Sequence, residues 1–116
     1  MSELTKLTSK LHKRAYANQT LYIFYCPGCD CGHVYYVIVP DARRRGNDTG
    51  WTFDGDIDSP TFTPSLKNTW TEGEEHIPKC CHLIMIAGKI NYCSDCTHQL
   101  AGQVVDMVDI PDGYGT

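Results

Sequence analysis

Residues 21–40 have the sequence LYIFYCPGCDCGHVYYVIVP, and this stretch decides the fold. The two outer runs, at 21–26 and 33–40, are rich in aromatic and β-branched residues, which predicts two strands. The turn CPGCDCG joins them and has the length of a hairpin knuckle. We therefore expect an antiparallel pair of strands whose turn carries metal ligands.

Further short strands are expected downstream. The sequence favours strands at 51–53, 60–66 and 103–108, and the stretch 81–93 predicts a hairpin that turns near Gly88. The expected fold class is mainly β, a small antiparallel sheet in a zinc-ribbon-like domain that covers residues 21–110.

The first residues are expected to differ from this β domain. Leu4, Leu7 and Leu11 recur at helical spacing, which predicts a short N-terminal helix. The last residues are rich in Pro and Gly and are expected to fray. The predicted organisation is a helical segment at 1–20, a zinc-binding β domain at 21–110 and a flexible tail at 111–116.

Length and composition exclude several classes of protein. The chain has 116 residues, 41% of them hydrophobic, which suits one globular domain. No apolar run approaches the ~20 residues that span a bilayer, and the start lacks the apolar centre of a signal peptide. We therefore expect no membrane association and a reducing cytosol. In that compartment seven cysteines favour a metal site over disulfides.

The charge distribution bears on nucleic-acid binding. The net charge is −4, and the acidic excess lies after residue 20, which disfavours a general affinity for phosphate. The basic run Arg43, Arg44 and Arg45 keeps a nucleic-acid-associated zinc protein as an alternative.

Cysteine and histidine fall into three clusters far apart in the sequence. Zinc prefers four thiolate or imidazole ligands in a tetrahedron, and a Cys-x-x-Cys turn lets two thiolates converge on one ion. A redox role for this turn is disfavoured, because the chain lacks the βαβ pattern of thioredoxin-like proteins. The clusters are Cys26, Cys29, Cys31 and His33; Cys80, Cys81 and His82; and Cys93, Cys96 and His98.

The spacing does not decide which residues bind the metal. Strand alternation should place Cys81 and His82 on opposite sides, so that one of them serves a given ion. The simplest assignment is a structural zinc site, and a rival assignment pairs Cys93 with Cys96 as in a zinc ribbon. The simplest set is Cys26, Cys29, Cys81 and Cys96.

Three histidines, His33, His82 and His98, then stand within four residues of proposed ligands. They are interpreted either as groups that orient the thiolates or as an open metal site with chemistry of its own. In the second interpretation a histidine acts as general base and Asp95 orients it.

The motifs CPGC with His33, WTFDGD, PTFTPS, Cys81-His82 and DCTHQLAGQ together resemble a known group of sequences. This is a family of small uncharacterised proteins of tailed phages and prophages, whose members are often labelled ammonia monooxygenase. Nothing in the sequence supports that label. The resemblance implies a phage origin, a location in the host cytoplasm or with the virion, and metal binding. The residues on its motif positions are Cys26, Cys29, His33, Cys81, His82, Cys96 and His98.

Two function classes follow from these observations. The favoured one is a zinc-stabilised binding module that engages a host or phage protein, with aromatic strand residues such as Tyr36 and Trp70 as contact surface. The alternative is a small metal-dependent hydrolase that uses His33, His82 and His98. The sequence shows no phosphate loop and no recognised nucleophile motif, so the binding module is preferred to an enzyme.

Overall fold

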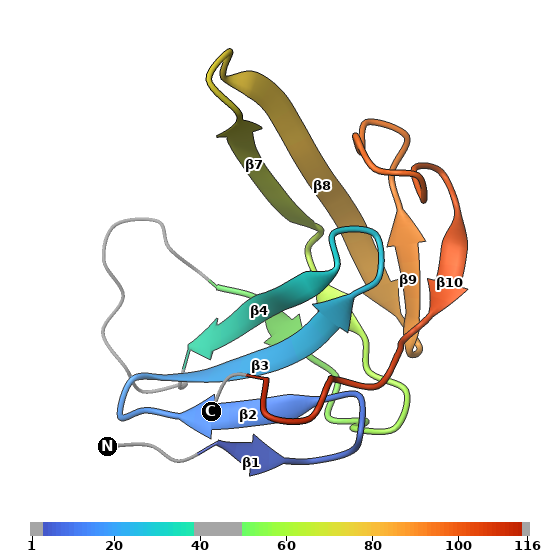
Figure 1. The fold of residues 1–116 in the computed structure, drawn as a ribbon. Coiled ribbons are helices and arrows are strands. Elements are labelled where there is room, and N and C mark those ends of the chain that lie inside the picture. Colours follow the sequence, from blue (N-terminus) through green and yellow to red (C-terminus); the bar gives the residue numbers. More distant parts are fainter. Residues whose placement is uncertain (1–3, 39–49, 115–116) are drawn as a thin grey trace.

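The computed structural model describes residues 4–38 and 50–114, and these residues form strands and loops without a helix. Two four-stranded antiparallel sheets, ordered β1-β2-β3-β4 and β10-β9-β8-β7, are accompanied by the ribbon β5-β6 (Figure 1). The mainly β, antiparallel fold class is confirmed. The strands are β1 (Thr5–Lys6), β2 (His12–Ala15), β3 (Gln19–Cys26), β4 (Cys31–Ile38), β5 (Thr52–Phe53), β6 (Phe62–Thr63), β7 (Leu66–Glu72), β8 (Ile77–Ile86), β9 (Lys89–Tyr92) and β10 (Val104–Asp106).

The predicted N-terminal helix is wrong. β1 and β2 form a hairpin, and β2 pairs with β3 over His12–Ala15. The Thr8 hydroxyl accepts hydrogen bonds from the backbone N–H groups of Lys10 and Leu11, which bends the chain between the strands. Leu11 is fully buried in the core. A three-leucine stripe has little intrinsic helical stability, so sheet pairing and the burial of Leu11 prevail over it.

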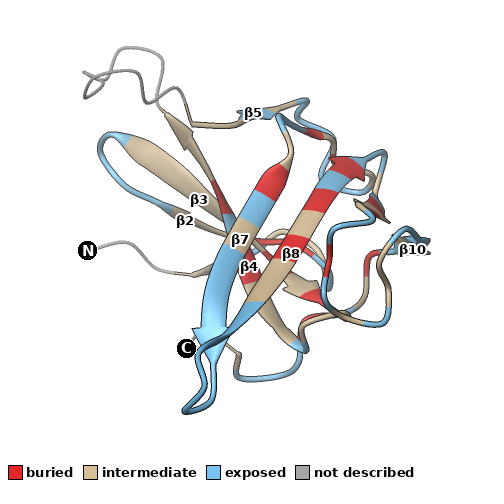
Figure 2. Cartoon of the chain, turned by 90° about the horizontal axis from the view of Figure 1, so that it is seen from above, coloured by how far each residue is buried: buried red, intermediate tan, exposed pale blue. Residues whose placement is uncertain are grey.

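The core lies between the two sheets and is largely aromatic at the β4 end. Tyr35 stacks on Phe62 with ring centroids 4.2 Å apart, and Phe62 stacks in turn on Phe53. The second sheet adds Leu83 and Met85 of β8, both fully buried. Buried and more exposed residues alternate along β8 (Figure 2). Because side chains alternate along a strand, one face of β8 packs on the core and the other meets solvent.

The hairpin predicted around Gly88 is present as β8 and β9, and it positions both sites described below. Gly88 has a positive φ of 75°, and a Cβ there would lie 3.1 Å from the backbone of Ser59, so the turn requires glycine. The knuckle of the β3–β4 hairpin spans residues 27–30, between Cys26 and its partner Cys31. Tyr114 reaches back to this hairpin and accepts a hydrogen bond from the N–H of Gly32.

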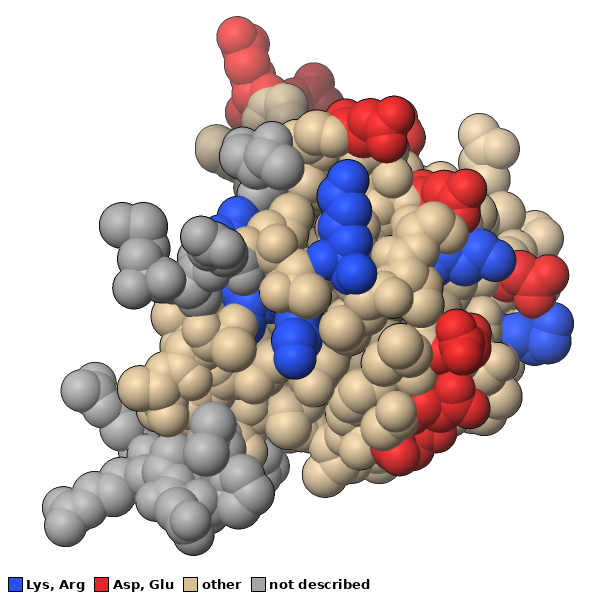
Figure 3. Space-filling view, turned by 90° about the horizontal axis from the view of Figure 1, so that it is seen from below, with Lys and Arg blue, Asp and Glu red and all other residues tan. Residues whose placement is uncertain are grey.

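The surface charges are mixed. On the face drawn in Figure 3, basic side chains lie over the middle, and acidic ones lie above them and along the right side, where further basic side chains lie among them. Arg43, Arg44 and Arg45, on which the nucleic-acid alternative rests, lie outside the described residues. The described part of the chain also contains no helix long and apolar enough to cross a membrane.

Candidate active site and metal centre

Ser65, His82 and Asp95 form a hydrogen-bonded chain on the solvent-facing side of the second sheet. The Ser65 hydroxyl lies 3.1 Å from Nε2 of His82. On the other side of the ring, Nδ1 lies 3.1 Å from both carboxylate oxygens of Asp95. Serine, histidine and aspartate in this order have the geometry of a nucleophile, its base and the group that orients the base.

Strand register explains why these residues meet. Lys67 of β7 pairs with His82 of β8, and Ser65, two residues before Lys67, lies on the same face and diagonal to His82. Leu66, between them, points to the core and is buried. The indole N–H of Trp51 donates to the carbonyl of Ser65 at 3.3 Å, which fixes the backbone that carries the hydroxyl.

The loop after β9 brings Asp95 to His82. The N–H of Cys93 donates to the His82 carbonyl at 2.8 Å. The Cys96 sulfur accepts from the N–H of His82 at 3.2 Å and lies 3.1 Å from its carbonyl oxygen. Asp95 therefore stands between two residues that both hold the backbone of His82, so its carboxylate has little freedom to leave the ring.

The site is only partly shielded from water. The side chains of His82 and Asp95 are 24% and 45% exposed, and Lys67 Nζ lies 3.5 Å from the Asp95 carboxylate. Desolvation opposes ionisation of Asp95, but the hydrogen bond from His82, with the charges of His82 and Lys67, lowers its pKa below the usual value. Asp95 is thus an ionised carboxylate at neutral pH, as the orienting role requires.

A second group of ligating side chains lies beneath the triad, on the core side of β8. One ligand atom from each of its four residues lies within 4.8 Å of all the others. The Cys81 sulfur is 3.8 Å from the Cys26 sulfur and 3.4 Å from Nε2 of His98. Such a set can close on a tetrahedral ion with small movements. The residues of this metal centre are Cys26, Cys29, Cys81 and His98.

The chemistry of these thiols fits a cation. The contact with the Cys81 thiol, and after it the hydroxyl of Tyr92, lower the pKa of Cys26 to about 3. The same contact raises the pKa of Cys81, and burial together with the Cys26 charge raises that of Cys29 to about 12. Negative charge on one of these sulfurs therefore opposes ionisation of the other two. A bound divalent cation would let all three ionise, as metal ligation requires.

The knuckle and Tyr92 pack closely against His98 at the metal centre. A Cβ on Gly28 would lie 2.4 Å from the His98 ring, so only glycine lets the knuckle approach His98 this closely. The Tyr92 ring packs edge-on against His98 with centroids 4.6 Å apart. Its hydroxyl lies 3.0 Å from the Cys26 sulfur, a contact that supports a thiolate.

A comparison with protein families bears on the group of Ser65, His82 and Asp95. The family described as "Bacterial ubiquitination-like system serine protease (BubE)" matches residues 2–93, which include Ser65 and His82. The chain belongs to this family. The match ends two residues before Asp95. Searches of curated proteins and of solved structures found no match. Membership in the BubE family does not show the phage origin expected from the sequence, which stays a prediction.

The structure distributes the residues singled out from the sequence over both sites. Cys26, Cys29 and Cys81 lie together, with His98 beside them, whereas Cys96 contacts the backbone of His82. His33 is buried on β4, where its Nδ1 accepts from the Asn68 amide at 3.1 Å.

The three histidines do not form a common site. Among the residues that the structure describes, each group of potential metal ligands contains one histidine only. His82 instead belongs to the triad. Sequence reasoning missed Ser65, although it did pair a histidine base with Asp95. The available signal was a serine that directly precedes a strand, and that signal is weak.

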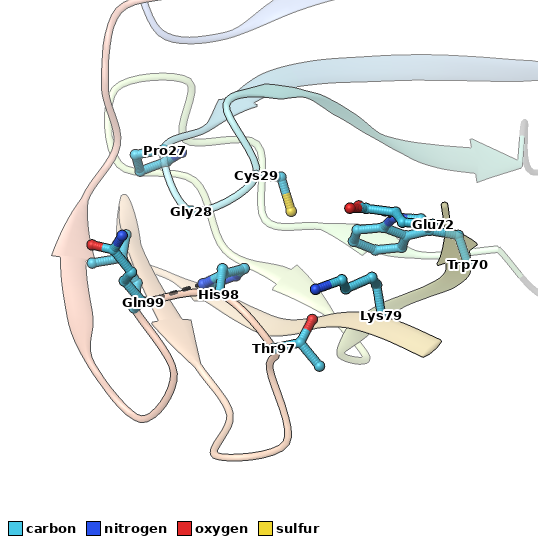
Figure 4. A pocket seen from close by; sticks show the side chains of 10 residues that line it. Pro27, Gly28, Cys29, Trp70, Glu72, Lys79, Thr97, His98 and Gln99 are labelled. Atoms are coloured by element: carbon cyan, nitrogen blue, oxygen red, sulfur yellow. Dashed lines mark hydrogen bonds between the residues drawn. The ribbon is translucent and has the colours of Figure 1, made fainter. Parts of the chain in front are cut away.

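Each site borders a cavity. A pocket of about 510 Å³ is open to the metal centre, and Figure 4 shows Cys29, His98 and Lys79 facing this space. A groove of about 590 Å³ runs along β7 and β8 and reaches Asp95 and Lys67. The two cavities share Trp70 of β7, Lys79 of β8 and Thr97 of the loop after β9. Of the three triad residues, only Asp95 lines this groove.

Proposed function

We propose that this chain is a serine protease of a bacterial ubiquitination-like system, with Ser65 as nucleophile. The observation that carries the proposal is the chain of hydrogen bonds from Ser65 through His82 to Asp95, at 3.1 Å for each step. The BubE family description supports the same chemistry, and Ser65 and His82 lie within the matched residues.

The proposed reaction is acyl transfer in two halves. Ser65 Oγ attacks the carbonyl carbon of the scissile bond while its proton passes to His82 Nε2. Asp95 accepts the hydrogen bond from Nδ1–H, which keeps Nε2 free to take that proton. His82 then protonates the leaving amine, and the carbonyl carbon stays bonded to Ser65 as an ester. Water, deprotonated by His82, then attacks the ester carbon; the C–Oγ bond breaks, His82 returns the proton to Ser65 Oγ, and the acyl group leaves as a carboxylic acid.

The substrate that we propose is a protein of the ubiquitination-like system that the family description names. The protein partner expected from the sequence is thereby interpreted as a substrate. A protease must hold its substrate in an extended form, and the groove beside Asp95 offers space for such a segment. The binding-module and nucleic-acid hypotheses stay predictions.

We further propose that the metal centre holds zinc in a structural role. Three thiolates and one imidazole are a common ligand set for structural zinc. The ion would join the knuckle of the first sheet to β8 and to the loop after β9. That loop also carries Asp95, so the ion would stabilise the orienting arm of the triad.

A fluorophosphonate probe, which labels activated serine hydroxyls, tests this proposal. We expect stoichiometric labelling of the full chain, with the adduct mapped to Ser65 by peptide mass spectrometry. Labelling should survive a brief exposure to chelator, because no metal touches the reacting atoms. Absence of labelling in folded protein that holds one equivalent of zinc, or an adduct at another residue, would contradict the proposal. Rapid chelator-dependent loss would instead favour the metal-dependent hydrolase.

A further inference from the structure

The thiol of Cys93 stands beside the triad and takes no part in the proposed reaction. Leu83 pairs with Tyr92 at the end of β9, so the next residues, His82 and Cys93, lie opposite each other on the solvent-facing side. The bond from the Cys93 N–H to the His82 carbonyl continues this pairing. The thiol therefore lies in one row with the imidazole across the sheet.

Cys93, His82 and Asp95 form a group of potential metal ligands. The Cys93 sulfur, a ring nitrogen of His82 and a carboxylate oxygen of Asp95 all lie within 4.8 Å of one another. Nδ1 is the nitrogen that faces Asp95, at 3.1 Å. Thiolate, imidazole and carboxylate are the three ligand types that zinc accepts, and three protein ligands leave one position for water. This group shares no residue with the metal centre.

We propose that this group is a second, exchangeable site for a zinc-class divalent cation, and that its occupation switches the triad off. An ion on Nδ1 replaces the hydrogen bond to Asp95 and forces the neutral imidazole to carry its proton on Nε2. Nε2–H then donates to Ser65 instead of accepting its proton, so His82 ceases to be a base. The inhibitory effect rests on the proposed protease function, whereas the binding itself does not.

The exposure of the site predicts that binding is reversible. The side chains of His82 and Asp95 are accessible, and the Lys67 ammonium, 3.5 Å from Asp95, must move aside when a cation arrives. The repulsion of Lys67 weakens binding relative to the buried metal centre. A second ion should therefore leave first when chelator is added, and the triad should recover.

Cobalt titration of the full chain, preloaded with one equivalent of zinc, tests the binding. We expect one further equivalent of Co²⁺ to bind, with the near-ultraviolet charge-transfer band of a thiolate–cobalt bond. In C93S that band should disappear and the affinity should fall by at least about 10-fold. The matched control is C80S, because Cys80 is a neighbouring thiol that borders the same groove but belongs to no group of ligands. C80S should retain the band.

Fluorophosphonate labelling with and without excess zinc tests the switch. The ratio of the two labelling rates should be at least about 10 in the natural chain and in C80S, and near 1 in C93S. The binding proposal is overturned if no second equivalent of cobalt binds, or if C93S keeps the band. Equal zinc sensitivity of C93S and the natural chain overturns the switch. If Ser65 is not labelled in the absence of excess zinc, the proposed protease function is wrong. The cobalt titration still decides whether the second metal site exists.

Discussion

Cys81 and His82 are neighbours in the sequence, yet they serve two sites with opposite physical character. Cys81 is fully buried among thiols and an imidazole, whereas His82 is partly exposed between a hydroxyl and a carboxylate. The alternation of side chains along β8 separates them by the thickness of the strand. Adjacent chemically active residues therefore need not act together, and a strand can present a structural site on one face and a reactive one on the other.

The two sites meet again in the loop after β9. Asp95 of this loop completes the triad, and His98, three residues later, completes the metal centre. The base His82 and its orienting residue Asp95 thus stand on two segments that each contribute a ligand to the metal centre. Variants that disable one site at a time show how far the two sites are independent.

The substitution Ser65→Ala is expected to separate the two sites most strongly, because it should abolish hydrolysis and leave metal binding intact. Removing the nucleophile should lower peptide-bond hydrolysis by about 10⁶-fold, because none of the acyl transfer can begin. The metal content should stay that of the natural chain, since Ser65 lies on the solvent-facing side of the sheet. Hydrolysis assays and elemental analysis measure both. Ser94→Ala is the matched control and should keep its activity. Activity that persisted in Ser65→Ala would assign the chemistry to another residue.

Asp95→Asn probes the part of the triad that lies nearest the metal centre. The amide has the same shape but cannot hold Nδ1–H in the productive tautomer, so hydrolysis should fall by about 10⁴-fold. Zinc affinity of the metal centre should not change. Asp106→Asn is a suitable control, because Asp106 also has a lowered pKa, through its hydrogen bond with Lys89 on the remote edge of the sheet. A comparable loss in both variants would argue against a specific role for Asp95.

Much of the fold could be predicted from sequence because its determinants are local. The runs on either side of CPGCDCG and the turn at Gly88 gave the β3–β4 and β8–β9 hairpins. The start of the chain could not be predicted in this way. Leu4, Leu7 and Leu11 satisfy a helical period, but the partner that makes residues 12–15 a strand is β3, which local periodicity does not show.

The features of the two sites were also predictable from the sequence only where their determinants are local. The pairing of Cys26 with Cys29 and the opposite orientation of Cys81 and His82 depend on turn length and strand alternation, which the sequence contains. Ser65 is missed because its partner His82 lies across a strand pair whose register the sequence leaves open. The choice between Cys96 and His98 depends on how the loop after β9 bends.

Removal of the metal is expected to affect both sites unequally. With free zinc at about 1,000 times its Kd, binding stabilises the fold by about 4 kcal/mol, so prolonged chelation should lower the melting temperature by more than about 10 °C. Labelling of Ser65 should fall less than in Asp95→Asn, by about 10²-fold, because Asp95 is displaced and not removed. Calorimetry and probe labelling of the same sample measure both. An unchanged melting temperature would show that the metal centre is not structural.

The smallest effect on zinc binding and labelling is expected from Tyr92→Phe. This substitution perturbs the metal centre alone. The variant keeps the ring that packs on His98 but loses the hydroxyl 3.0 Å from the Cys26 sulfur. Zinc affinity should fall by about 10–100-fold, as when other groups that support metal ligands are removed, while labelling of protein that holds one equivalent of zinc stays constant. Tyr25→Phe is the control, because its hydroxyl contacts Asp30 and no ligand of the metal centre. If labelling fell together with zinc affinity even with the metal centre filled by one equivalent of zinc, the two faces of β8 would be coupled through more than the ion.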